Sequence, residues 1–217
     1  MSDPNPCAGP FGAAYDFWIE RPWLSAIVGR AMWGIDTAPL YASIESAVAG
    51  RGGGETLLDV PCGGGLALRA LRPAQDVRFV ATDISEPMLE RTRRRAAARS
   101  LGQVETVSAD MQALPFADGF ADLCLSYSGL HVVPHPRRAL GELVRCLRPG
   151  GDLVGSTFLA AGTRRQRAIF QAGRRRGLPS PEFTADDLRA WLAEARIEDA
   201  FVDRHAGFAM FGGRKQR

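Results

Sequence analysis

The stretch Leu57-Leu58-Asp59-Val60-Pro61-Cys62-Gly63-Gly64-Gly65 decides the fold. Its apolar first half is typical of a buried strand, and its glycines let the backbone turn sharply and approach a ligand closely. In an open α/β sheet, ligands bind at the carboxyl ends of the strands, so the sequence predicts a ligand site at this turn. A tight turn without a ligand is the alternative interpretation.

Short runs typical of strands alternate with helical patterns around this stretch, which predicts a parallel sheet with helices on both faces. The predicted strands are Thr56–Val60, Arg78–Thr82, Val104–Ser108, Asp122–Ser126 and Asp152–Phe158, followed by an antiparallel hairpin of Ile197–His205 and Gly207–Gly212. The predicted helices are Leu66–Leu71, Glu86–Ala98, Pro136–Leu147 and Ala185–Ala195. The expected fold is therefore α/β, with a Rossmann-like, seven-stranded, mostly parallel sheet flanked by helices and a C-terminal antiparallel hairpin.

Asp83 lies at the end of the second predicted strand, eighteen residues after Gly65. A carboxylate there can accept hydrogen bonds from both hydroxyls of a ribose, so the glycine turn and Asp83 together indicate a nucleoside ligand. Alternatively, Asp83 caps the helix that begins behind the cap-like Ser85. A dinucleotide is the rival ligand, but its G-x-G-x-x-G pattern is broken because Leu68 stands where the third glycine belongs.

Four segments between Thr56 and Leu159 carry a family resemblance. They are Leu58–Gly65, Asp83 with Ile84 and Met88, Ala109-Asp110-Met111 followed by Leu114-Pro115-Phe116, and Arg145–Gly151. In these segments the chain resembles class I S-adenosylmethionine-dependent methyltransferases, particularly the small-molecule branch that includes enzymes of ubiquinone and menaquinone biosynthesis. The resemblance implies S-adenosyl-L-methionine as the cofactor, S-adenosyl-L-homocysteine as its product, and methylation of a small acceptor at oxygen or carbon.

The resemblance also implies which residues hold the methionine part of the cofactor. Cys62, Gly63 and Gly65 would line it through the backbone. Asp59 would orient the loop or contact the amino group of the cofactor, and Ser126 would lie nearby at the end of the fourth strand.

The nucleoside part of the cofactor has its own implied residues. Asp83 would hold the ribose, and Ile84 and Met88 would pack on the adenine. Asp110 would bind the adenine amino group, with the Met111 amide beside it.

The chain departs from the family pattern in the loop, where Pro61 and Gly64 stand in place of the usual Gly and Thr. Because proline removes a donor and fixes φ, we expect a stiffer loop with different hydrogen bonds.

Methyl transfer requires alignment of donor and acceptor, exclusion of water and, for some acceptors, a base. His131 follows the fourth strand and is the candidate base, with a structural hydrogen-bonding role as the alternative. Tyr15, Trp18, Tyr127 and His131 are the candidate residues of the acceptor pocket. Packing of the capping helices on the sheet is the other explanation for the N-terminal aromatics.

The chain has 217 residues, of which 46% are hydrophobic, and this suffices for one domain with a substantial core. Within residues 1–217 we expect four parts. They are N-terminal capping helices at 1–50, the cofactor-binding core at 56–159, a substrate lid at 160–184, and the last helix with the hairpin at 185–217.

The four cysteines show neither metal-ligand spacing nor a disulfide pattern, and the N-terminus lacks the layout of a secretory signal. We therefore expect a cytoplasmic monomer or homodimer without a metal site or a membrane span. The net charge of +3 is mild and does not by itself indicate nucleic acid.

Basic residues concentrate in two runs. Arg91–Arg99 is expected to be the exposed face of a helix, whereas Arg164–Arg176 either steers an anionic acceptor or is a solvated helix face. The acceptor is thus expected to be small, and apolar, aromatic or anionic. A nucleic-acid methyltransferase and a catalytically silent, cofactor-binding partner subunit are the alternative functions.

Overall fold

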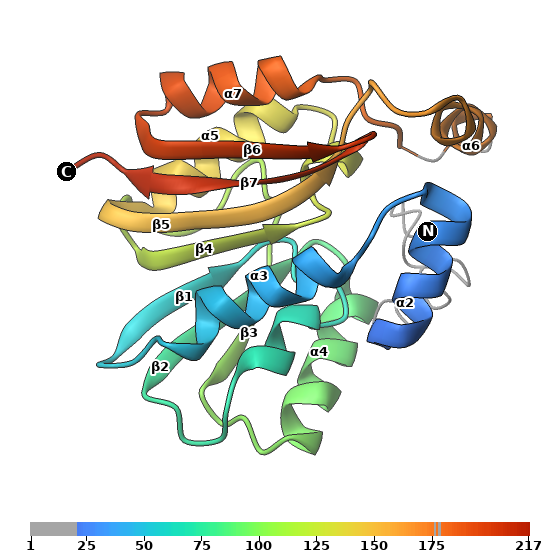
Figure 1. The fold of residues 1–217 in the computed structure, drawn as a ribbon. Coiled ribbons are helices and arrows are strands. Elements are labelled where there is room, and N and C mark those ends of the chain that lie inside the picture. Colours follow the sequence, from blue (N-terminus) through green and yellow to red (C-terminus); the bar gives the residue numbers. More distant parts are fainter. Residues whose placement is uncertain (1–20, 176, 178) are drawn as a thin grey trace.

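The computed structural model describes residues 21–175, 177 and 179–217, which form a sheet covered by helices (Figure 1). Its seven strands lie in the order β3-β2-β1-β4-β5-β7-β6. They are β1 (Glu55–Asp59), β2 (Val77–Asp83), β3 (Val104–Ser108), β4 (Ala121–Tyr127), β5 (Leu147–Phe158), β6 (Ile197–His205) and β7 (Phe208–Lys215). The first five pair in parallel, and β7 runs antiparallel to both β5 and β6. The predicted fold class is confirmed.

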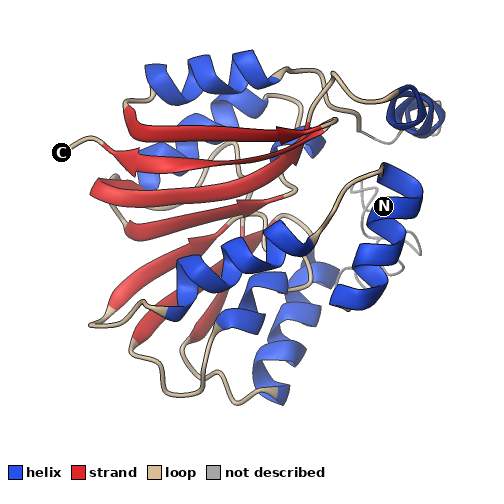
Figure 2. Cartoon of the chain, viewed as in Figure 1, coloured by secondary structure: helices blue, strands red, loops and turns tan. Residues whose placement is uncertain are grey.

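Helices cover both faces of the sheet (Figure 2). The α-helices are α2 (Pro22–Val28), α3 (Ala38–Ala49), α4 (Glu86–Ala98), α5 (Pro136–Cys146), α6 (Arg164–Arg174) and α7 (Ala185–Glu194). Three shorter helical segments are η1 (Gly29–Trp33), η2 (Leu66–Ala70) and η3 (Leu130–Val132). No helix within these described ranges is both long enough and apolar enough to cross a bilayer.

Two apolar layers form because successive strand residues point to opposite faces of the sheet. Leu58 and Cys124 pack into the layer that contains α5 and α7. Their chain neighbours Leu57 and Leu123 pack into the layer that contains α3, η2 and α4. The central strands are therefore apolar on both sides, as expected for a sheet buried between helices.

The end of α5 differs from the prediction. We expected this helix to continue to Leu147, but it ends at Cys146, and Leu147 pairs with Ala121 at the start of β5. The Lys215 ammonium donates hydrogen bonds to the carbonyl oxygens of Val144 (2.8 Å) and Leu147 (2.7 Å). A residue from the far end of the chain thus satisfies carbonyl groups at the end of α5, which local sequence does not reveal.

Ser85 occupies the N-cap position of α4, but its hydroxyl makes no capping hydrogen bond. The Ser85 backbone N–H instead donates to Oδ1 of Asp83 at 2.9 Å. The side chain that supports the start of α4 is therefore the acid two residues earlier.

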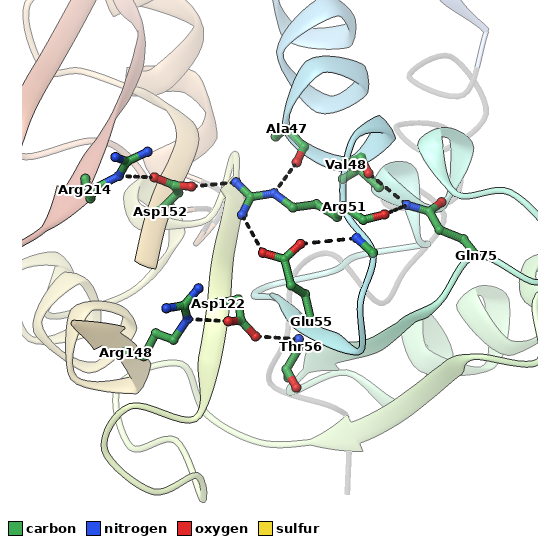
Figure 3. A network of polar contacts seen from close by, with 11 residues as sticks. Ala47, Val48, Arg51, Glu55, Thr56, Gln75, Asp122, Arg148, Asp152 and Arg214 are labelled. Atoms are coloured by element: carbon green, nitrogen blue, oxygen red, sulfur yellow. Dashed lines mark hydrogen bonds and ion pairs between the residues drawn. The ribbon is translucent and has the colours of Figure 1, made fainter. Parts of the chain in front are cut away.

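An ion-pair network joins the amino ends of the central strands (Figure 3). The Arg51 guanidinium donates to Asp152 of β5 at 2.6 Å and to Glu55 of β1 at 3.2 Å. Asp152 also accepts a hydrogen bond from Arg214 of β7 at 3.0 Å. Although partial burial by itself raises the pKa of Asp152, the hydrogen bonds from Arg51 and Arg214 hold it below its usual value. This network fixes the edge of the sheet opposite the glycine loop.

Replacing Arg51→Gln is expected to lower the free energy of unfolding by about 2 kcal/mol, because it leaves Asp152 and Glu55 with fewer partners in a partly buried place. Urea denaturation at neutral pH measures this loss. The matched control is Arg78→Gln, which breaks the half-exposed pair with Glu105 and should cost less than about 1 kcal/mol. Equal losses in the two variants would contradict a structural role for the Arg51 network.

Candidate functional site

The glycine loop turns at the carboxyl end of β1 through two residues in the left-handed region. Gly63 has φ +52° and Gly65 has φ +82°, a conformation in which a side chain is strained. A Cβ atom on Gly63 would meet nothing within 4 Å, whereas one on Gly65 would lie 3.0 Å from Oγ1 of Thr92. The space beside Gly63 is therefore open, whereas the loop packs closely against Leu68 and Thr92 at Gly65.

The Gly63 residue is held from two sides. Its N–H donates to Oδ2 of Asp83 at 2.9 Å, and its carbonyl oxygen accepts a hydrogen bond from Oγ1 of Thr92 at 2.9 Å. Asp83 ends β2 and Thr92 is fully buried on α4. We refer to the contacts of Gly63 with Asp83 and Thr92 as the Gly63 clamp.

Asp59 lies at the end of β1, buried, and its Oδ2 atom has no hydrogen-bond partner among the described residues. Burial, and then the charge of Asp83, raise the pKa of the Asp59 carboxyl well above its usual value. Burial also raises the pKa of the neighbouring Cys62 thiol, with smaller contributions from Asp59 and Asp83. Two acids thus lie close together in this part of the loop, and a cation bound there would favour the ionised form of Asp59.

Unpartnered polar atoms gather at the same edge of the sheet. Across residues 21–175, 177 and 179–217, five buried side-chain oxygen atoms lack a hydrogen-bond partner, and all of them lie near the carboxyl ends of parallel strands. They belong to Asp59, Thr82, Ser85, Ser126 and Ser156. Because buried polar groups normally find partners, these oxygen atoms are the ones that a polar ligand at this end of the strands would satisfy.

The residues expected around an adenine lie beyond β2 and β3. Ile84 is 62% exposed, and Met88 is buried on α4. The carboxylate of Asp110 accepts hydrogen bonds from the backbone and side chain of Gln112, and Met111 is buried in the core. An isoleucine that is exposed directly after Asp83 offers an apolar surface to a flat ring.

Ser126 and Pro61 lie where β4 meets the loop. Ser126 is fully buried, and its hydroxyl is among the unpartnered groups. The Pro61 ring lies so close to Gly129 that a Cβ atom at position 129 would overlap it. Pro61, which departs from the family pattern, is thus accommodated by a glycine on the neighbouring loop.

His131 lies beside an aromatic cluster at the end of β5. Its ring packs edge-on against Phe158, with centroids 5.1 Å apart, and Phe158 in turn contacts Trp33 and Phe170. The Phe158 N–H donates a long hydrogen bond to Nδ1 of His131 at 3.5 Å, and the Thr157 hydroxyl lies 3.5 Å from the same nitrogen. Acceptance at Nδ1 assigns the proton of the neutral ring to Nε2. Burial lowers the pKa of His131 to about 4.

The remaining candidates for the acceptor pocket have different outcomes. The Tyr127 hydroxyl lies 3.0 Å from that of Ser43 on α3, and burial raises the pKa of Tyr127. Tyr127 thus ties the sheet to a covering helix. Tyr15 and Trp18 lie outside the described residues.

Three residues of this region escaped the sequence analysis. Thr92 lies within the run that we interpreted as an exposed face, but it shares the buried face of α4 with Met88 and Ala96 at helical spacing. The four-residue spacing of Met88, Thr92 and Ala96 was the sequence signal that could have predicted a buried Thr92. Trp33 and the buried Gln166 meet through a 2.7 Å hydrogen bond from Nε2 of Gln166 to the Trp33 carbonyl oxygen, a contact between distant segments that no local pattern marks.

Comparisons with known proteins agree with this architecture. A family model described as a methyltransferase domain matches residues 58–155. A demethylmenaquinone methyltransferase of Clavibacter sepedonicus is 45% identical over 146 residues, which cover 67% of this chain and 54% of that protein. A phthiotriol/phenolphthiotriol dimycocerosates methyltransferase of Mycobacterium tuberculosis is 32% identical over 170 residues, covering 75% of this chain and 60% of that protein.

Among solved structures, a phosphoethanolamine N-methyltransferase of Haemonchus contortus aligns with a TM-score of 0.70 at 12% identity, covering 83% of this chain and 53% of that one. This similarity concerns the fold alone. The chain spans about half the length of the curated relatives it matches. The sheet order, the glycine loop and the matched family model all agree with a methyltransferase domain over residues 58–155, and in this part the chain is similar to class I S-adenosylmethionine-dependent methyltransferases.

Proposed function

We propose that this protein binds S-adenosyl-L-methionine at the glycine loop and transfers its methyl group to a small acceptor at oxygen or carbon. The buried Asp59 carboxyl with an unpartnered oxygen carries the proposal. The cofactor bears an ammonium group and a positively charged sulfur, and a buried acid needs such a partner to ionise. The residues present therefore fit this ligand.

The cofactor supplies an electrophilic methyl group, and the protein positions the two reactants. Asp59 and the backbone of Cys62, Gly63 and Gly65 would hold the methionine part, with Ser126 nearby. Asp83 would hold the ribose, because each carboxylate oxygen can accept more than one hydrogen bond. The Gly63 clamp would fix the loop before the cofactor arrives, which lowers the entropy cost of alignment.

The adenine contacts are part of the same proposal. Ile84 and Met88 would pack on the ring, and Asp110 would accept from its amino group beside the Met111 amide. The exposure of Ile84 and the half-buried position of Asp110 support this assignment, since both leave the side chains accessible to a ligand.

For the acceptor we propose a small apolar or aromatic molecule that enters beside the aromatic cluster of Trp33, Phe158 and Phe170. His131 borders this cluster and, with its proton on Nε2, would orient an acceptor oxygen by donating a hydrogen bond. The base function expected of His131 stays a prediction. Uptake of a proton at Nδ1 would remove the hydrogen bond from the Phe158 N–H, which opposes this function. The cytoplasmic location also stays a prediction.

Calorimetric titration with S-adenosyl-L-methionine tests the proposal, with NADH as the rival ligand. We expect micromolar binding of the former, and a loss of at least about tenfold in Asp83→Asn, because one carboxylate oxygen becomes a donor that faces a backbone N–H. Asp203→Asn, an exposed acid on β6, is the control and should bind as the wild type does. Preference for NADH, or no binding, would overturn the cofactor assignment.

The Gly63 clamp gives a second test. Thr92→Val preserves shape but removes the hydroxyl, so the affinity for the cofactor should fall by about fivefold, the worth of one neutral hydrogen bond. Thr92→Ser should restore most of it. Thr106→Val is the matched control, because it also removes one hydrogen bond, from Arg93 at the surface, but none to Gly63. If the Thr106 and Thr92 valine variants bind equally well, the clamp does not position the loop.

The pKa of His131 predicts a pH effect on stability. Its pKa is about 4 in the folded protein and about 6.5 when unfolded, so the unfolded state takes up the proton first as the pH falls. The stability contributed by the neutral ring is present above about pH 6.5 and is lost as the pH falls towards 4. His131→Asn keeps an acceptor near the Phe158 amide but does not titrate.

The wild type should therefore lose roughly 3 kcal/mol more than His131→Asn between pH 7 and pH 4, measured by urea denaturation. A constant difference between the two proteins over this range would show that the ring stays accessible to protons in the folded state.

A further inference from the structure

Three large apolar side chains are exposed close together on α2 and η1. Trp23 is 65% exposed, Ile27 58% and Met32 44%, and they are three of the five such side chains among the described residues. Trp23 and Ile27 are four residues apart and therefore share one face of α2. A cluster of this kind usually marks a surface that meets another apolar phase or partner.

Helix α6 is strongly basic and contains no acidic residue. Arg164, Arg165, Arg167 and Arg174 belong to it, Arg175 follows it, and all five are exposed. Arg174 pairs with Glu182, whereas Arg164 and Arg165 make no ion pair with any residue that the structure describes. We refer to the exposed surface of α2, η1 and α6 as the basic–apolar face.

Direct contacts hold the two parts of this face together. Gln166 of α6 donates to the Trp33 carbonyl oxygen of η1 at 2.7 Å, and the rings of Trp33 and Phe170 lie 5.3 Å apart. Figure 1 shows α2 and α6 at the same end of the molecule, beyond the carboxyl ends of the parallel strands. The exposed apolar side chains and the arginines thus lie at the end of the protein that carries the glycine loop.

We propose that the basic–apolar face docks on the surface of an anionic lipid bilayer. Tryptophan and aliphatic side chains enter the headgroup region, while arginines are attracted to acidic headgroups. The segments 21–33 and 164–175 contain arginines and no acid, so their charge complements such a surface. Ile27 and Met32 favour lipid over nucleic acid, because aliphatic side chains offer no plane on which a base can stack.

Docking in this orientation has a consequence that rests on the proposed function. The aromatic cluster beside His131 lies beneath α6 and η1, so a docked protein would turn the proposed acceptor pocket towards the bilayer. An apolar acceptor dissolved in the membrane could then reach the cofactor without crossing water.

Sedimentation of the full chain with vesicles tests the proposal. We expect binding to vesicles of phosphatidylcholine and phosphatidylglycerol in equal parts, weakened by salt, and little binding to phosphatidylcholine alone. The double variants Trp23→Ser/Ile27→Ser and Arg164→Gln/Arg165→Gln should each lose about tenfold or more in affinity. All variants should bind cofactor in solution as the wild type does, which separates this test from that of the proposed function.

The controls lie on β6 or just before it, away from the basic–apolar face. Phe201→Ser removes an exposed apolar side chain, and Arg196→Gln/Arg204→Gln removes two exposed charges. Absence of vesicle binding, or equal losses in the controls, would overturn the proposal. Binding of single-stranded RNA that depends on Arg164 and Arg165 but not on Trp23 and Ile27, without vesicle binding, would replace the lipid surface by nucleic acid.

Discussion

The shape of the glycine loop depends on how the backbone of Gly63 is held. Asp83 holds its N–H and Thr92 holds its carbonyl oxygen, so the loop takes its shape from two elements that follow it in the chain. A local turn preference alone would leave this glycine several conformations. The shape of the glycine loop therefore depends on tertiary packing, because both contacts require β2 and α4 to be docked on β1.

Polar groups at the amino ends of the parallel strands are paired, whereas several at the carboxyl ends are not. At the amino ends, Arg51, Asp152 and Arg214 satisfy one another, and the Asp122 carboxylate accepts a hydrogen bond from the Thr56 backbone N–H at 2.7 Å. At the carboxyl ends, buried hydroxyl and carboxyl oxygens are left without partners within the described chain. One edge supplies rigidity, and the other keeps its hydrogen-bonding capacity for ligands, as is usual in open α/β sheets.

Periodicity and glycine chemistry predicted most of the fold, because strands buried on both faces and a helix with proline in its first turn are marked locally. Helix Glu86–Ala98 and strand Ile197–His205 have the predicted bounds. The start of β5 at Leu147 and the role of Thr92 depend on contacts between distant segments. Likewise, the sequence predicted that His131 follows the fourth strand of the sheet, but it did not reveal the contact of its ring with the Phe158 N–H.

Gln166 links three segments of the chain at the carboxyl ends of the parallel strands. Its side chain donates to the Trp33 carbonyl and accepts from the Gly207 N–H at 3.2 Å, and its bulk leaves no room for a side chain at Gly162 or Gly207. Three segments, with Trp33 lying 133 residues before Gln166 and Gly207 lying 41 residues after it, thus pack together as one unit. A chimaera that exchanges the region of α6 for that of a relative would have to exchange η1 and the hairpin turn with it.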